Sequence, residues 1–204
     1  MNGKLILRWG LFTLGMIALT FGARMILLST LGVSGLDAVA IGLAEWLNVS
    51  IGTMIIILGI ILTLIGGIIN HHLNLLPITI SLLIGGLYDI WGNILFNQIK
   101  FPTYQLYQGC IFLIGILIAP MGAALYITSQ FSVGPVDYIM LAIKNKYSYS
   151  IQLSRTLLES FFVVSGWLLG GPIGIGTFCI MLFWGPILQI YLHILEKILK
   201  KYIQ

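Results

Sequence analysis

Ser34-Gly35-Leu36-Asp37 and, one hundred residues later, Gly134-Pro135-Val136-Asp137 are the two stretches that decide the fold. Each follows a long apolar segment and opens a short one, and each brings an aspartate into an otherwise almost uncharged part of the chain. Glycine and proline interrupt a helix and free its backbone groups. We expect the aspartate after each break to cap the next helix by accepting its first N–H groups.

The composition around these breaks is that of a membrane protein. The 204 residues are 59% hydrophobic and 8% charged, whereas a soluble domain carries about 25% charged residues. The formal charge of +4 does not indicate nucleic acid as a partner, because the basic residues cluster at the ends of apolar segments. We find no catalytic motif, metal motif or phosphate loop, and Cys110 and Cys179 stand alone in apolar runs. The sequence therefore predicts an integral membrane protein that is not an enzyme and needs no metal or cofactor.

Apolar segments follow one another in the order long, short, long, long, and this order occurs twice. The long segments are 9–31, 50–69, 75–96, 106–131, 151–170 and 173–195, and the short ones are 36–47 and 136–143. A helix needs about 20 residues to cross a bilayer, so the short segments are not expected to span. The sequence predicts an all-α polytopic protein, with six transmembrane helices and two short helices in a single membrane domain, residues 1–204.

The two halves also match residue by residue. Without any gap, seventeen positions between Phe12 and Leu95 are identical to the residue 100 positions later. This periodicity indicates a duplication, with repeat 1 at 8–97 and repeat 2 at 108–197. Three spans per repeat would invert the second copy relative to the first, as in many transporters. If the short segments also cross, there are eight spans and the repeats are parallel.

Basic residues orient the chain. Under both topologies the same seven residues fall on the cytoplasmic side, and these are Lys4, Arg8, Lys144, Lys146, Lys197, Lys200 and Lys201. Lys100 is the basic loop residue that changes sides between the two topologies. We therefore expect both termini to be cytoplasmic.

Charged residues inside the spans are candidates for function, because ionisable groups at membrane depth are costly unless paired or hydrated. Arg24 and Asp89 both fall in the outward halves of their segments, with Gln189 at the position equivalent to Asp89. We expect Arg24 to pair with a carboxylate, Asp89 first and Asp37 second. Such a pair fixes helix register or belongs to a binding site.

Glu159 lies near the middle of its segment and four residues after Arg155, so both side chains share one helical face. In one interpretation Arg155 reaches the cytoplasmic interface and Glu159 neutralises it. In the other, Glu159 faces a cavity, where it binds a cation or carries a proton.

The two breaks suggest where a ligand would bind. They serve as helix caps alone, or they supply backbone groups and helix dipole ends to a substrate, as broken helices do at repeat interfaces. In the second case we expect a shared polar cavity between the repeats, with Glu159 as its deepest charge. The candidate substrate-binding residues are Ser34, Gly35, Asp37, Gly134, Pro135, Asp137, Glu159, Arg24, Asp89 and Gln189.

Several motifs resemble the YczE/YyaS/YitT family of bacterial membrane proteins, and the YczE branch in particular. The matching stretches are Arg8-Trp9 with Leu11-Phe12 and Gly15, then Gly134 to Asp137, Gly170 to Thr177, and Gly185-Pro186. The first break departs from the family pattern, which has Pro-Trp where this chain has Gly35-Leu36. The resemblance implies a location in the bacterial cytoplasmic membrane.

Three functions agree with these features. The first is a small-molecule transporter or permease, whose small-molecule or ion substrate binds between the repeats. The second is an accessory or regulatory scaffold in the membrane without a substrate of its own. The third is the substrate-binding subunit of a vitamin-type transporter. The lipid bilayer is the expected surrounding in all three, and a homodimer or another membrane protein is a further possible partner.

Overall fold

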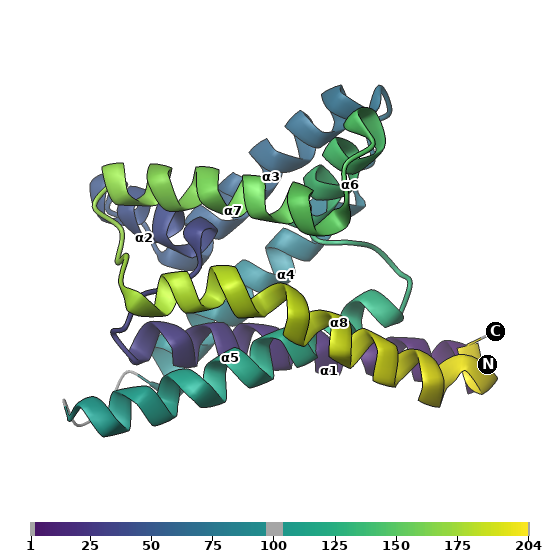
Figure 1. Cartoon of the computed structure of the whole chain (residues 1–204), viewed down its shortest axis with the longest axis horizontal. Helices are drawn as coiled ribbons and strands as arrows, with labels where there is room; N and C mark the ends of the chain where they lie inside the picture. The colour runs from purple at the N-terminus through teal and green to yellow at the C-terminus, as the bar shows by residue number, and fades with distance from the viewer. Residues whose placement is uncertain (1–2, 97–103, 204) are drawn as a thin grey trace.

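The computed structural model describes residues 3–96 and 104–203, and this part of the chain folds into eight α-helices and one π-helical turn. Figure 1 shows that both termini lie at the same end of the molecule. In chain order the elements are α1 (Gly3–Leu28), α2 (Gly35–Leu47), α3 (Ile51–Asn70), α4 (Leu76–Ile90), η1 (Trp91–Leu95), α5 (Gln105–Thr128), α6 (Pro135–Tyr147), α7 (Ile151–Leu168) and α8 (Ile175–Ile203). Each expected segment, long or short, corresponds to one helix, with η1 continuing α4. Lys100 lies outside the described residues.

Five of the described helices are long and apolar enough to cross a membrane, namely α1, α3, α4 with η1, α5 and α8. The sixth expected span forms α7, which has 18 residues and carries both Arg155 and Glu159. The short helices α2 and α6 have 13 residues each. The described part of the chain is therefore all-helical, and its apolar helices fit an integral membrane protein, as the composition predicts.

Helices α1 and α5 lie against each other and run in opposite directions along the lower side of the molecule in Figure 1. Glycine makes their close approach possible. A Cβ atom at Gly15 would lie 2.5 Å from Tyr126 N, and one at Gly115 would lie 3.0 Å from Ile26 N. These two contacts join equivalent positions, because each residue of one pair is 100 positions from a residue of the other.

Polar contacts at both ends of this helix pair also join equivalent positions of the two halves. Arg8 Nε donates to Ser129 O at 2.7 Å, and Arg8 Nη2 donates to Gln130 O at 2.9 Å. At the opposite end, Gln108 Nε2 donates to Thr30 Oγ1 at 2.9 Å. Each side chain from the start of one helix thus bonds residues that follow the other helix: Arg8 satisfies two backbone carbonyl groups after α5, and Gln108 bonds the Thr30 hydroxyl after α1.

The short helix α2 begins halfway along α7 and runs beside its second half. A Cβ atom at Gly35 would lie 2.7 Å from Val163 N, and one at Gly42 would lie 2.6 Å from Leu169 O. After α1 ends, the chain therefore turns back toward the middle of the molecule before α2 starts.

The short helix α6 has the same relation to α3. Pro135 Cγ is 3.3 Å from a Cβ built at Gly59, near the middle of α3, and the Tyr138 ring is 2.6 Å from a Cβ at Gly66. Tyr138 also donates a hydrogen bond of 2.7 Å to His72 O, beyond the end of α3. The N-termini of α2 and α6 therefore both lie inside the molecule, and the helices run outward toward opposite ends of α7 (Figure 1).

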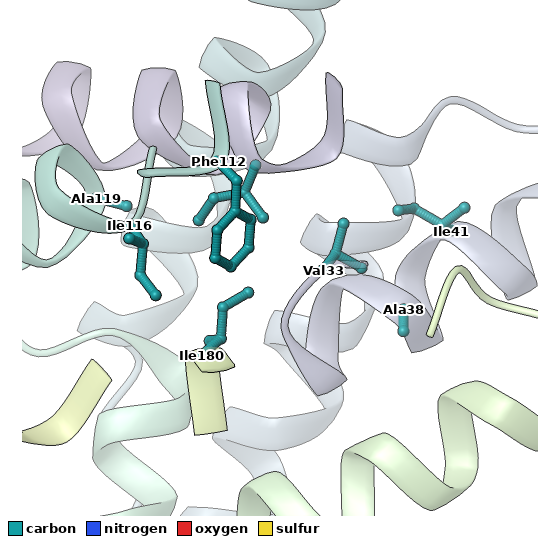
Figure 2. Close-up of a cluster of buried hydrophobic side chains, with 8 residues drawn as sticks. Val33, Ala38, Ile41, Phe112, Ile116, Ala119 and Ile180 are labelled. Carbon is teal, nitrogen blue, oxygen red and sulfur yellow. The ribbon is translucent and has the colours of Figure 1, made fainter. Parts of the chain in front are cut away.

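A buried apolar cluster holds the first break in place (Figure 2). It joins α1, α2, α5 and α8 through Ile26, Val33, Ala38, Ile41, Phe112, Ile116, Ala119 and Ile180. Two backbone hydrogen bonds secure the connecting loop, from Val33 N to Pro172 O at 3.2 Å and from Gly176 N to Leu31 O at 2.7 Å. The turn between α1 and α2 is thus fixed by the turn between α7 and α8.

Candidate functional site

A cavity of about 150 Å³ lies where the two short helices begin, and every α-helix contributes to its wall. Most of the wall is aliphatic, with a few polar side chains, which is typical of a site for a small molecule. Six of the ten predicted site residues line it, namely Ser34, Asp37, Gly134, Pro135, Asp137 and Glu159.

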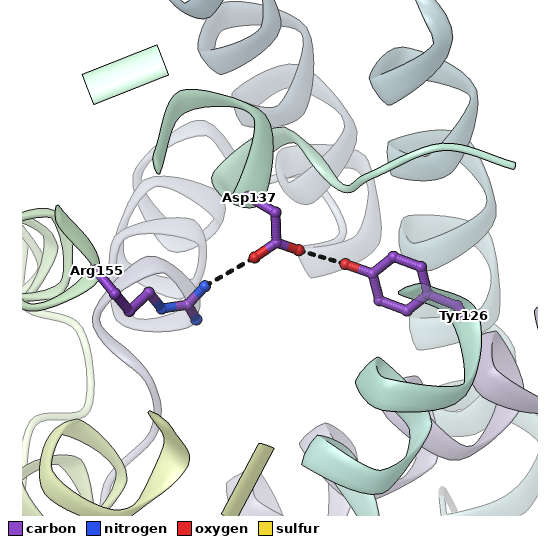
Figure 3. A network of polar contacts seen from close by, with 3 residues as sticks. All are labelled: Tyr126, Asp137 and Arg155. Atoms are coloured by element: carbon purple, nitrogen blue, oxygen red, sulfur yellow. Dashed lines mark hydrogen bonds and ion pairs between the residues drawn. The ribbon is translucent and has the colours of Figure 1, made fainter. Parts of the chain in front are cut away.

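Asp137 is held on both sides by residues of other helices (Figure 3). Its Oδ1 atom forms an ion pair with Arg155 Nη1 at 3.2 Å, and its Oδ2 atom accepts a short hydrogen bond from the Tyr126 hydroxyl. The side chains of Arg155 and Asp137 are 25% and 16% exposed. The Arg155 guanidinium also lies 5.9 Å from the centre of the Trp184 ring, within range of a cation–π interaction.

Asp37 does not cap α2 itself, contrary to expectation, because Ser34 takes that role. Ser34 is the N-cap, and its Oγ accepts from Asp37 N at 3.2 Å while donating to Asp37 Oδ2 at 2.8 Å. This reciprocal arrangement is related to a capping box, in which the N-cap and the third helical residue support each other. Asp37 therefore orients the capping serine.

Glu159 closes the rest of this helix end. Its side chain is 6% exposed, and its Oε1 atom accepts a hydrogen bond of 2.7 Å from Gly35 N. The interpretation in which Glu159 neutralises Arg155 is therefore wrong, because Arg155 pairs with Asp137 instead. Their four-residue spacing does place both side chains on the cavity wall, as the shared helical face predicts.

The start of α6 has no comparable closure. Its N-cap is Gly134, which has no side chain to accept a hydrogen bond, and Pro135 has no N–H to donate. Within the described residues, the N–H groups of Val136 and Asp137 also have no hydrogen-bond partner. Asp137 thus does not cap α6, which corrects the second capping prediction.

Four predicted site residues do not line the cavity, namely Gly35, Arg24, Asp89 and Gln189. Asp89 accepts from Ser50 Oγ at 2.5 Å and from Gly52 N at 2.8 Å, so it fixes the start of α3. The expected ion pair with Arg24 is therefore wrong. Among the described residues no acid lies within 4.0 Å of Arg24, whose guanidinium lies 5.3 Å from the centre of the Tyr88 ring. Gln189 is exposed on α8.

The cavity also contains aromatic residues that sequence reasoning missed, namely Tyr88, Tyr126 and Trp184. Tyr88 is 1% exposed, and its hydroxyl has no hydrogen-bond partner in the described chain. Aromatic residues near span ends usually form an interfacial belt. Their positions in the sequence therefore do not indicate that these three residues line a cavity. For Tyr126 a signal was available, because the equivalent position in the first half is the apolar Ile26.

The comparisons with known proteins identify a family. A family of unknown function, DUF6198, matches residues 6–193. The chain belongs to this family. The uncharacterized Bacillus subtilis protein YyaS is 28% identical over 187 residues, which cover 91% of this chain and 92% of YyaS.

Two further relatives extend the match. The B. subtilis protein YczE, described as a membrane protein, is 28% identical over 93% of this chain and 87% of its own length. An uncharacterized Haemophilus influenzae protein is 31% identical over 92% of this chain and 84% of its own length. The resemblance to YczE and YyaS is thus confirmed, and the relative described as a membrane protein agrees with the apolar helices of this chain. No solved structure matches the chain significantly.

Proposed function

We propose that this DUF6198 protein is a small-molecule transporter or permease of the bacterial cytoplasmic membrane. Its substrate binds in the cavity between two inverted three-span repeats, and both termini are cytoplasmic. The observation that carries this proposal is the position of the cavity, where a helix N-terminus from each half of the chain reaches the middle of the molecule. The proposal assigns no catalytic step to the cavity residues.

Paired contacts support the inverted repeats. The antiparallel crossing of α1 and α5 relates Gly15 and Tyr126 to Gly115 and Ile26, as a twofold axis in the membrane plane requires. The same axis relates α2 on α7 to α6 on α3. In this arrangement α7 is the sixth span, and Arg155 and Glu159 are tolerated because both line the cavity.

The cavity also meets a physical demand of the bilayer. Backbone groups freed at membrane depth must face protein or water, because lipid offers no hydrogen bonds. The free N–H groups of Val136 and Asp137 begin the helix whose first turn lines the cavity. Transporters use such broken helices to hold substrates at the bilayer midplane.

The two halves pack unequally, which favours a transporter that changes conformation over a static scaffold. Helices α3 and α4 meet closely, since Gly52 and Gly85 leave no room for a side chain between the two backbones. The equivalent pair, α7 and α8, packs less extensively, with Ser160 Oγ 4.0 Å from Met181 Sδ. Two repeats in different packing states are what alternating access between the two sides of a membrane requires.

A cysteine accessibility experiment tests transport without knowledge of the substrate. In a chain with Cys110→Ser and Cys179→Ser, Ile127→Cys places a thiol on the cavity wall, and Leu113→Cys places one on the exposed side of the same helix. The probe is a methanethiosulfonate with a permanently charged trimethylammonium group, applied to right-side-out and inside-out vesicles. We expect Ile127→Cys to react from both sides and Leu113→Cys from neither. Reaction of Ile127→Cys from one side or neither contradicts transport through this cavity and favours a scaffold.

The repeat orientation is tested separately, with Gln105→Cys at the first residue of α5 and Tyr149→Cys after α6, both of them exposed positions. Six spans place these residues on opposite sides of the membrane, whereas eight spans and parallel repeats place both in the cytoplasm. An impermeant maleimide on intact cells should therefore label Gln105→Cys and leave Tyr149→Cys unlabelled. Labelling of neither position contradicts inversion.

A further inference from the structure

We infer that the cavity binds one small monovalent organic cation, an ammonium group carried on an apolar body about the size of benzene. This inference rests on the proposed function, because it names the substrate class of the same site. Three features carry it: the charge of the cavity, its unpaired acceptor atoms, and its size and apolar wall.

The charge balance of the cavity favours a cation. Its wall carries three carboxylates, Asp37, Asp137 and Glu159, against one guanidinium, Arg155, which gives a formal charge of −2 (one minus three) when all are ionised. Each helix N-terminus contributes the equivalent of about +0.5 charge. When the N-termini of α2 and α6 are added to the side-chain charge of −2, the cavity keeps a net charge of about −1. A single monovalent cation neutralises this charge.

The unpaired acceptor atoms also match an ammonium group. Both carboxylate oxygens of Asp137 are occupied, by Arg155 and Tyr126. In contrast, Asp37 Oδ1 and Glu159 Oε2 have no hydrogen-bond partner among the described residues, since Ser34 and Gly35 bond the other oxygen of each.

Tyr88 adds an independent observation that indicates a ligand. Its hydroxyl is buried and forms no hydrogen bond among the described residues, although the residue lines the cavity and the Arg24 guanidinium lies 5.3 Å from the centre of its ring. A buried hydroxyl without a hydrogen bond is costly. A primary ammonium donates three hydrogen bonds, and Asp37, Glu159 and Tyr88 together offer three acceptors.

The apolar wall limits the size of the rest of the ligand. A cavity of about 150 Å³ lined by aliphatic residues is large enough for benzene. A metal ion fits less well, because in the described chain no three His, Cys, Asp or Glu residues are grouped to hold one. The Trp184 ring also lines the wall, and aromatic faces attract organic cations.

Three ligands that share one ring and differ in charge test this inference. Benzylammonium, benzyl alcohol and benzoate are titrated into the purified full-length protein in detergent, and affinity is measured by calorimetry. We expect benzylammonium to bind at least tenfold more tightly than benzyl alcohol, and benzoate to bind most weakly. Equal affinities, or tighter binding of benzoate to the free N–H groups of α6, would overturn the inference.

Variants then locate the charge. Asp37→Asn and Glu159→Gln retain an oxygen for Ser34 and Gly35, so the fold is kept while the charge is lost. Each should weaken benzylammonium binding at least tenfold and leave benzyl alcohol unchanged, and Tyr88→Phe should weaken benzylammonium about threefold. Glu45→Gln, which removes an exposed acid of α2, is the matched control and should change nothing. Unchanged binding in both Asp37→Asn and Glu159→Gln would overturn the inference.

Proteoliposomes separate this inference from the proposed function. If the protein binds benzylammonium selectively but does not carry labelled benzylammonium across the bilayer, transport is contradicted and the cation site stands. If labelled benzoate crosses and benzylammonium does not, transport stands and the cation site is wrong.

Discussion

The N-termini of α2 and α6 occupy equivalent places in the two halves, but one is closed by side chains and the other is open. At α2, Ser34 and Glu159 accept the N–H groups of Asp37 and Gly35. At α6, Gly134 is equivalent to Ser34 and Gly59 is equivalent to Glu159, so neither equivalent residue has a side chain that can accept a hydrogen bond. The two breaks therefore share one backbone path, although the side chains around them differ in their hydrogen bonding.

Helix α7 is the source of this divergence, because it supplies a charged partner to both breaks. Glu159 bonds the start of α2, and Arg155 pairs with Asp137 at the start of α6. The equivalent positions in α3 are Gly59 and Ile55, which have no charge. The cavity is therefore one asymmetric site rather than two copies of a half-site, and substitutions at equivalent positions should have unequal effects.

The largest difference is expected for an added methyl group at each break. Gly35→Ala places a Cβ 2.7 Å from Val163 N and 2.9 Å from Glu159 O, which are backbone atoms that cannot move aside. At Gly134 the nearest atom is the Tyr126 hydroxyl oxygen, 3.2 Å away. Gly35→Ala should lower the free energy of unfolding by about 3 kcal/mol, typical of severe overpacking. Gly134→Ala should change it by less than about 0.5 kcal/mol.

Reversible unfolding of the purified protein in mixed micelles measures both values. If Gly35→Ala and Gly134→Ala lower the free energy of unfolding equally, the difference in packing is contradicted. The start of α2 would then lie no closer to α7 than the start of α6 lies to its own neighbours.

An intermediate difference is expected between the two aspartates. Asp137→Asn leaves Arg155 without its ionic partner, at a cost of about 2 kcal/mol, between the values for exposed and buried pairs. Asp37→Asn should cost less than about 1 kcal/mol, because the asparagine oxygen still accepts from Ser34.

A double variant isolates the ion pair, because Arg155→Met removes the unpaired charge that Asp137→Asn creates. The two changes together should destabilise less than the sum of the single changes. Additive losses would mean that the pair contributes nothing to stability.

The parts of the structure set by local chemistry could be predicted from the sequence. The breaks at Gly35 and at Gly134-Pro135, the short helices after them and the apolar lengths between them follow from backbone rules that act within a few residues. These rules predicted each described helix and placed six of the ten candidate residues on one cavity wall.

Partners across helices could not be predicted in the same way. Asp89 was expected beside Arg24, but it bonds the first turn of α3, whose free N–H groups compete well for a carboxylate. One of the two interpretations of Glu159 paired it with Arg155 four residues earlier, but Arg155 pairs with Asp137 from another helix. Both errors arise because hydropathy and spacing do not determine which helix faces which.

The smallest and sharpest test exchanges the caps themselves. Ser34→Ala removes the oxygen that accepts from Asp37 N, and loss of such a cap costs about 1 kcal/mol. Gly134→Ser supplies the missing cap to α6. A serine N-cap stabilises a helix by only a few tenths of a kcal/mol more than a glycine N-cap. Its side chain must also fit beside the Tyr126 hydroxyl oxygen, which lies 3.2 Å from the Cβ position. The same unfolding measurement should therefore show a clear loss for Ser34→Ala and a small gain for Gly134→Ser. If Gly134→Ser also lowers benzylammonium affinity, the added hydroxymethyl group takes space that the ligand occupies beside α6, whereas an unchanged affinity assigns the ligand to the acids beside α2.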